Sequence, residues 1–248
     1  MDFTGRPLVA QNDAMTEATI PTDASPANKE AARSSEGTAE SIATLLGDEI
    51  YQGKHAPDAP LREIALATRL GVSRRSVREA LLLLERRGLV LHEHNRGARV
   101  RRMRQADVLD LYRVRRILEV QGARAAPTAS TAARTHLARA YETLVASGES
   151  NDSFEIIRAD LAFHGAVVGL ADSPRIDGFF RHIGDEMRFA IALLREDETR
   201  SGVADIDVVA DHSAIYRHLL DGDVVEAQLA ILQHIEFNER RLLRLVAA

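Results

Sequence analysis

The chain has 248 residues, no cysteine and a formal net charge of −5. These features exclude disulfide bonds and thiolate metal sites, and no run of about 18 uncharged apolar residues could span a membrane. We expect a cytoplasmic protein of two domains, because no secretory signal is recognisable and a domain commonly contains about 100 to 200 residues.

The charge is distributed unevenly along the chain. Residues 37–104 contain 13 Lys and Arg against 8 Asp and Glu, which gives +5, whereas residues 105–248 contain 16 against 23, which gives −7. The first 36 residues hold the remaining 3 against 6. A basic segment joined to an acidic one is typical of a nucleic-acid reader attached to a domain with another role.

The first predicted elements are a tail and two helices. Residues 1–36 are rich in Ala, Thr, Ser, Asp and Pro and lack an apolar period, so we predict a disordered tail. Apolar residues at helical spacing predict one helix over 38–53 and another over 61–70. The turn Gly71-Val72-Ser73 then leads into a third helix, which is the helix-turn-helix arrangement.

The third helix has a basic leading end. Ser73 is a good N-cap, and Arg74, Arg75 and Arg78 follow it within the first turn and a half. One face is apolar, so the arginines lie off the buried side; its residues are Val77, Ala80, Leu81 and Leu84. This geometry suits insertion into the major groove of DNA. The alternative is a solvated amphipathic helix whose arginines have no partner molecule.

A hairpin follows the third helix. Residues 89–93 and 98–101 are predicted strands, with a turn over 94–97 between them. Asn95 and Arg96 at its tip could contact the DNA backbone or the minor groove, or remain an exposed loop. Three helices and a hairpin predict a winged helix-turn-helix domain over residues 37–103.

The rest of the chain has only helical patterns. Residues 104–248 therefore predict an all-α bundle of six to seven helices, and the fold class is mainly α. The expected helices cover 106–125, 131–147, 154–170, 174–195, 206–220 and 223–246.

Four possible metal ligands occur in the predicted bundle. Asp160 and His164 lie four residues apart on one helix face, and His212 and His234 lie on later helices beside apolar residues. One oxygen and three nitrogen donors suit Zn, Ni, Mn or another divalent ion. Each histidine alone is also consistent with an ordinary core or surface position, and spacing does not show whether the three helices converge.

Arg115 lies on the apolar stripe of its helix and therefore needs an anion there. Glu119, four residues later, is one candidate partner, and a bound ligand is the other.

Taken together, these segments resemble the GntR family of bacterial transcription regulators, in its FadR-type subgroup with an all-helical FCD ligand-binding domain. The first half of the resemblance is carried by Leu70-Gly71-Val72-Ser73-Arg74, Val77-Arg78-Glu79-Ala80-Leu81, Glu85-Arg86-Arg87-Gly88-Leu89-Val90 and Asn95-Arg96-Gly97-Ala98-Arg99-Val100. The second half is carried by Val114-Arg115-Arg116-Ile117-Leu118-Glu119, Asp160-Leu161-Ala162-Phe163-His164, Asp211-His212-Ser213-Ala214-Ile215, and Gly222-Asp223 leading to His234.

The resemblance implies a homodimer that binds double-stranded operator DNA. Arg74 and Arg78 would contact the DNA, and further contacts would come from Ser73, Arg75, Asn95 and Arg96.

The resemblance also implies a divalent metal ion, zinc first and nickel or manganese as alternatives. Its ligands would be Asp160, His164, His212 and His234, and Arg115 would hold a small organic acid beside it. We thus expect a ligand-responsive regulator, a repressor in preference to an activator, and not an enzyme. Two alternatives stay open: a metal-dependent hydrolase or oxygenase that uses the Asp and His ligands, and a constitutive DNA-binding protein with a structural metal.

Overall fold

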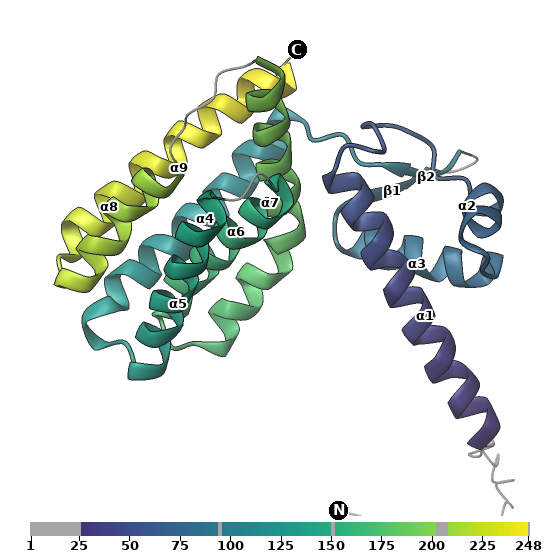
Figure 1. The fold of residues 1–248 in the computed structure, drawn as a ribbon, viewed down its shortest axis with the longest axis horizontal. Helices are drawn as coiled ribbons and strands as arrows, with labels where there is room; N and C mark the ends of the chain where they lie inside the picture. Colours follow the sequence, from purple (N-terminus) through teal and green to yellow (C-terminus); the bar gives the residue numbers. More distant parts are fainter. Residues whose placement is uncertain (1–25, 94–95, 150–151, 202–207, 248) are drawn as a thin grey trace, which may run out of the picture.

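The computed structural model describes residues 26–93, 96–149, 152–201 and 208–247 (Figure 1). A winged helix-turn-helix unit lies beside a bundle of six helices, so the expected mainly α fold is confirmed. In this described part of the chain, no helix combines the length and the apolarity needed to cross a membrane.

The winged unit contains three helices and a two-stranded antiparallel sheet. Its elements are α1 (Pro26–Tyr51), α2 (Glu63–Leu70), α3 (Arg74–Arg86), β1 (Val90–Glu93) and β2 (Gly97–Val100). In the sheet, Val90 pairs with Val100 and Glu93 with Gly97. Buried apolar side chains of α1 and α3 face one another and hold the two helices together; they include Leu46, Ile50, Leu81 and Leu84.

Helix α1 begins earlier than the sequence predicted. It starts at Pro26, inside the stretch expected to be a tail, and its N-terminal end projects away from the rest of the molecule in Figure 1. The segment 27–33 contains alanine, lysine, glutamate and arginine, which have high helix propensity. The sequence prediction relied on apolar periodicity, which this segment lacks. Residues 1–25 of the expected tail lie outside the described residues.

The bundle closely follows the predicted helices. It consists of α4 (Gln105–Ala125), α5 (Thr131–Gly148), α6 (Ser153–Gly169), α7 (Pro174–Ser201), α8 (Val208–Asp221) and α9 (Val224–Ala247), with a short 3-10 turn at Ala126–Thr128. Helix α4 packs against α6, α7 and α9, and its Gly122 allows a close approach to the backbone of Val167 on α6. Helix α7 continues six residues beyond the expected end at residue 195.

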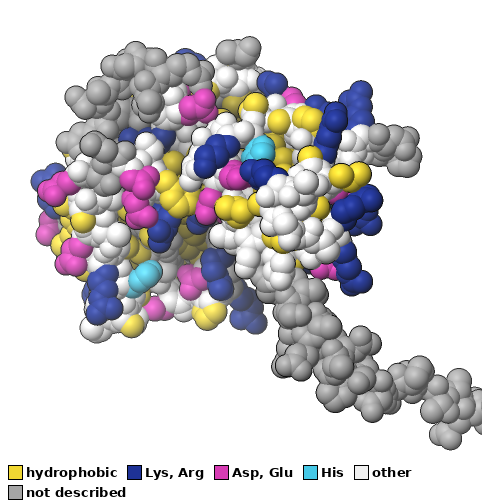
Figure 2. Space-filling view, turned by 45° about the vertical axis from the view of Figure 1, so that its right-hand side comes forward, with side chains coloured by type: hydrophobic (Ala, Val, Ile, Leu, Met, Phe, Trp, Pro, Cys, Tyr) yellow, Lys and Arg dark blue, Asp and Glu magenta, His cyan; other side chains and the backbone are white. Residues whose placement is uncertain are grey.

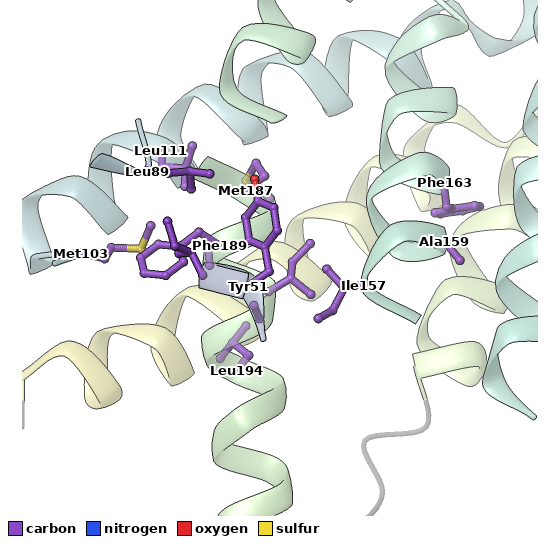
Figure 3. Close-up of a cluster of buried hydrophobic side chains, with 14 of the residues drawn as sticks. Tyr51, Leu89, Met103, Leu111, Ile157, Ala159, Phe163, Met187, Phe189 and Leu194 are labelled. Atoms are coloured by element: carbon purple, nitrogen blue, oxygen red, sulfur yellow. The ribbon is translucent and has the colours of Figure 1, made fainter. Parts of the chain in front are cut away.

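One apolar core joins the two units. Figure 3 shows part of it, with Tyr51 and Leu89 from the winged unit and Met187 and Phe189 from α7. Polar contacts lie beside this core: the Tyr51 hydroxyl donates to Asp185 Oδ1 at 2.9 Å. Helix α7 therefore belongs to the bundle and also forms the surface on which the winged unit packs.

Candidate DNA interface and metal centre

The third helix starts and packs as its sequence predicts. The backbone N–H of Ser76 donates to Ser73 Oγ at 3.0 Å, so Ser73 caps the N-terminus. The side chains of Val77 and Leu81 are fully buried. This packing leaves Arg74, with its neighbours on the outer face, exposed to solvent.

The exposed arginines of α3 differ in their partners. Arg75 Nε donates to Glu79 on the same helix at 2.9 Å, and Arg78 makes two 2.8 Å bonds to Glu63 on α2. Hydrogen bonding from Arg78 holds the pKa of Glu63 below its usual value. Arg74 has no ion-pair partner within the ranges that the structure describes. Of the three arginines, Arg74 therefore has the most freely available donors.

The wing adds further basic groups beside α3. Arg96 is exposed and pairs with Glu93 at 3.4 Å, whereas Asn95 lies outside the described residues. Figure 2 shows Lys and Arg side chains gathered at the right-hand edge of the view, on the winged unit. The arginines at the start of α3 and in the wing thus belong to the unit with a net positive charge, as expected for a DNA-binding surface.

The four possible metal ligands converge in the bundle. Asp160 and His164 come from α6, His212 from α8 and His234 from α9. His212 Nε2 lies 2.9 Å from Asp160 Oδ1 and 3.1 Å from His164 Nε2, and Asp160 Oδ1 lies 3.9 Å from His164 Nε2. The ligand atoms of the three histidines all lie within 4.8 Å of one another.

These separations fit a first-row divalent ion. Two nitrogen ligands about 2.0–2.1 Å from one ion lie at most about 4.2 Å apart, so the histidine cluster needs little or no contraction to share an ion. His234 supplies a second indication, because its Nδ1 atom is buried and has no hydrogen-bond partner among the described residues. Donor chemistry and spacing both suit zinc. The imidazoles also suit nickel, and the carboxylate suits manganese.

Arg115 and Glu119 of α4 complete the cluster. Both are buried, and Arg115 Nε donates to Glu119 Oε1 at 2.5 Å. Arg115 Nη2 lies 2.7 Å from His164 Nε2, and His164 Nδ1 lies 2.8 Å from Glu119 Oε2. Glu119, one of the two partners expected for Arg115, therefore contacts it, and binding of an acidic ligand by Arg115 stays a prediction. Sequence spacing could find this pair, but it gave no sign that Glu119 also contacts His164.

The electrostatics of the cluster follow from burial and mutual charge. Burial would raise the pKa of Asp160, but His212, which donates to it, holds this pKa well below its usual value. Burial would likewise raise the pKa of Glu119, but Arg115 and His164 lower it more, so this pKa also lies below its usual value. Burial followed by neighbouring positive charge lowers the pKa values of His164 and His234. The lowered pKa values favour the ionised form of the two carboxyls and the neutral form of His164 and His234, and these are the forms that ligate metals.

A small cavity of about 30 Å³ lies beside the cluster. It is lined by Tyr112, Arg115, Asp160, Ile191, Leu194, Arg195, Asp211, His212, His234, Asn238 and Arg241. The Tyr112 hydroxyl is buried there without a hydrogen-bond partner in the described part of the chain, and burial raises the pKa of Tyr112 to about 12. Two unsatisfied polar groups, Tyr112 Oη and His234 Nδ1, thus belong to residues that line one cavity.

Comparisons with known proteins cover both units. Residues 38–100 match the family of bacterial regulatory proteins, gntR family, and residues 110–237 match the FCD domain. The chain is 32% identical over 227 residues to the Glc operon transcriptional activator of Escherichia coli (strain K12), covering 84% of this chain and 88% of that one. It is 27% identical to the "Probable D-xylose utilization operon transcriptional repressor" of Paenarthrobacter nicotinovorans, covering 75% and 80%.

A solved structure agrees with these sequence matches. The crystal structure of a "putative transcriptional regulator GntR" from Rhodococcus sp. RHA1 superposes with a TM-score of 0.72 at 29% identity, covering 84% of this chain and 98% of that one. The families and relatives are transcription regulators and not enzymes, which removes the hydrolase or oxygenase alternative. The chain belongs to the GntR family of bacterial transcription regulators, with an FCD domain following its helix-turn-helix domain.

Proposed function

We propose that this regulator is a homodimeric, ligand-responsive repressor that senses a small organic acid through a divalent metal ion in its bundle. The observation that carries the proposal is the meeting of Asp160, His164, His212 and His234 beside Arg115, from four separate helices. A buried arginine next to a set of metal donors is suited to an anionic ligand that also binds the metal.

The DNA-binding part of the proposal rests on α3 and the wing. Arg74 and Arg78 are the leading candidates for contacts to base edges or phosphates, and the supporting candidates are Ser73, Arg75, Asn95 and Arg96. The positive charge of this unit predicts that affinity falls as salt rises. The relatives differ in the direction of regulation, because one is named a repressor and another an activator. Repression is our proposal for this chain.

The metal would be held by Asp160, His164, His212 and His234. Zinc is our first choice, and nickel and manganese are the alternatives. When bound, such an ion supplies a Lewis acid to which a carboxylate oxygen can bind. Arg115, whose Nη2 lies 2.7 Å from His164 Nε2, would bind the same carboxylate.

Helix α7 offers a route between the two units. Ile191, Leu194 and Arg195 line the cavity, while Asp185 and Glu186, about two turns away, contact the winged unit. Glu186 accepts from Arg101 Nη1 at 2.9 Å. A ligand that moves the cavity wall would therefore shift the helix on which the DNA-binding unit is seated.

The homodimer is supported by apolar side chains left outside the bundle. Ile117 of α4 and Val225 of α9 are 64% and 71% exposed, and α4 and α9 pack against each other. A second copy that packs on α4 and α9 would bury these side chains and bring two copies of α3 to two half-sites of one operator. Measurement of the molar mass in solution, with Ile117→Glu as the disrupting variant, tests this part.

A second candidate function follows from the size of the cavity. A volume of about 30 Å³ holds a water molecule or two and no multi-carbon acid without rearrangement. This observation favours a structural metal in a DNA-binding protein that does not respond to ligand.

One experiment separates the two functions. Duplex DNA selected from a random pool by the wild-type protein serves as the probe. The full chain is stripped with a chelator, reloaded with Zn²⁺, Ni²⁺ or Mn²⁺, and titrated with acetate, lactate, glycolate or succinate while DNA affinity is measured. For the sensor, at least one acid changes affinity by about 5- to 150-fold only when metal is present. If chelation lowers the melting temperature but no acid changes affinity, the structural-metal function holds instead.

A further inference from the structure

Glu119 contacts two of the side chains on which the proposed metal centre depends. It is fully buried on α4, where Oε1 accepts from Arg115 Nε and Oε2 accepts from His164 Nδ1. The proposed ligand set does not include it, and its two oxygens are already occupied by these partners. Glu119 can therefore act on the metal centre only through Arg115 and His164.

The partners of His164 fix its protonation pattern. An ionised carboxylate can only accept, so the bond to Glu119 requires a proton on Nδ1. A guanidinium can only donate, so the 2.7 Å contact from Arg115 Nη2 requires a lone pair on Nε2. His164 is therefore the neutral Nδ1–H tautomer. Its bare Nε2 faces His212 Nε2 at 3.1 Å, inside the donor cluster.

We propose that Glu119 is a positioning residue for the metal centre, which holds the His164 ring with its bare Nε2 directed to the ion. The inference rests on the proposed function, because it assumes that His164 is a ligand. Carboxylates that hold the second nitrogen of a ligating histidine orient its ring and increase its basicity. Here the same carboxylate also anchors Arg115 through Nε, so an ion that takes the Nε2 lone pair displaces only Nη2.

A purely structural role for Glu119 needs a matched control. Glu239 on α9 is a buried carboxylate that accepts two bonds from Arg116, at 2.9 and 3.1 Å. It has the same kind of arginine partner on the same helix α4, and within the described residues it makes no hydrogen bond or ion pair with the metal-ligand candidates. Glu119→Gln and Glu239→Gln thus both remove a buried charge, and only the first alters the support of His164.

The test measures Zn²⁺ affinity of the full chain by competition with a chelating indicator, after circular dichroism has shown that each variant is folded. We expect Glu119→Gln to bind Zn²⁺ about 10- to 100-fold more weakly and Glu239→Gln to bind within about threefold of wild type. Glu119→Asp, which keeps the charge, should recover part of the loss. Equal Zn²⁺ affinity of Glu119→Gln and wild type overturns the inference.

A second measurement keeps the inference testable if Glu119→Gln does not fold. Nitrogen-15 NMR of the metal-free wild-type chain, with His164 assigned by its absence in His164→Gln, reports which ring nitrogen carries the proton. An Nδ1–H tautomer supports the inference, and an Nε2–H tautomer overturns it. Wild-type protein that binds no Zn²⁺ overturns the proposed metal centre together with this inference, whereas wild-type binding with an unaffected Glu119→Gln overturns the role of Glu119 alone.

Discussion

Arg78 on α3 and Glu63 on α2 form a bidentate ion pair across the helix-turn-helix, with two bonds of 2.8 Å. The bonds use Nε and Nη2 of the arginine, so the Nη1 edge is the part that remains for DNA. Glu63 therefore restricts the directions in which Arg78 can reach. It also places a negative charge beside a surface proposed to contact phosphates.

The first prediction concerns this pair. Glu63→Gln should raise affinity for non-specific duplex, because a negative charge is removed, and lower the preference for the selected site, because Arg78 is less restricted. We expect the ratio of specific to non-specific affinity to fall by up to about tenfold, or about 1.4 kcal/mol. Fluorescence anisotropy with a selected and a scrambled duplex measures both affinities. Glu79→Gln, which frees Arg75, is the control, and an unchanged ratio in Glu63→Gln would refute the prediction.

The second prediction concerns Arg74, whose donors are free of ion pairs in the described structure. If Arg74 contacts a base, Arg74→Ala should weaken binding to the selected duplex by about 1–3 kcal/mol. If Arg74 contacts a phosphate, the slope of log affinity against log salt concentration should become smaller by about 1. Thermal stability should not change, because the side chain is exposed. Arg113→Ala, which replaces another exposed arginine, on α4, is the control. Unaltered DNA binding by Arg74→Ala would remove α3 from the proposed interface.

The sequence predicted most of the fold because local signals agreed with the final packing. The N-cap Ser73 and the glycine at 88, whose φ is +74°, mark the two ends of the third helix. The start of α1 was missed because polar residues of high helix propensity leave no apolar period. The extension of α7 was missed because no proline or glycine marks its end near residue 195.

Only part of the candidate sites could be predicted from the sequence. Pairs on one helix, such as Arg115 with Glu119, follow from a spacing of four residues. Contacts between helices do not, because they depend on how the helices pack. Glu63 with Arg78, and Glu119 with His164, belong to this second kind. The convergence of α6, α8 and α9 on one cluster likewise required the tertiary structure.

The third prediction tests the close approach of α4 and α6. A Cβ atom added at Gly122 would lie 2.1 Å from the backbone oxygen of Val167, so the helices would have to separate. Gly122→Ala should destabilise the chain by about 1–3 kcal/mol or more. Gly184→Ala on α7, where nothing lies within 4 Å, should instead be neutral or stabilise by up to about 1 kcal/mol. Urea unfolding measures both, and equal stabilities would contradict the packing.

The fourth prediction tests α7 as the route between the units. Glu186→Gln removes the ion pair with Arg101, which is partly exposed, so stability should change by less than about 1 kcal/mol. In this variant, DNA affinity should change less when Zn²⁺ and an acid that acts on the wild-type chain are added, so the ratio of the affinities with and without them should move toward one. Glu155→Gln, which breaks an exposed pair on α6, should leave this ratio unchanged. A full response in Glu186→Gln would show that coupling takes another route.

The last prediction is a pH dependence of the metal-free chain. Burial lowers the pKa values of His164 and His234 below their ordinary value of 6.5. Below about pH 6.5 the unfolded chain therefore takes up protons that the folded chain does not, so stability falls as pH falls. Each histidine contributes up to about 1.4 kcal/mol per pH unit. The lowered pKa values of Asp160 and Glu119 add a loss only below about pH 4.5.

Urea unfolding in the presence of a chelator, at intervals from pH 8 to pH 5.5, measures this dependence. His234→Asn should show a shallower slope below pH 6.5, because one buried imidazole no longer resists protonation. Replacement of an exposed histidine, His136→Asn on α5, should leave the slope as it is in wild type. The same slope in wild type and His234→Asn would mean that His234 accepts a proton as readily in the fold as in the unfolded chain, contrary to its burial among His164, His212 and Arg115.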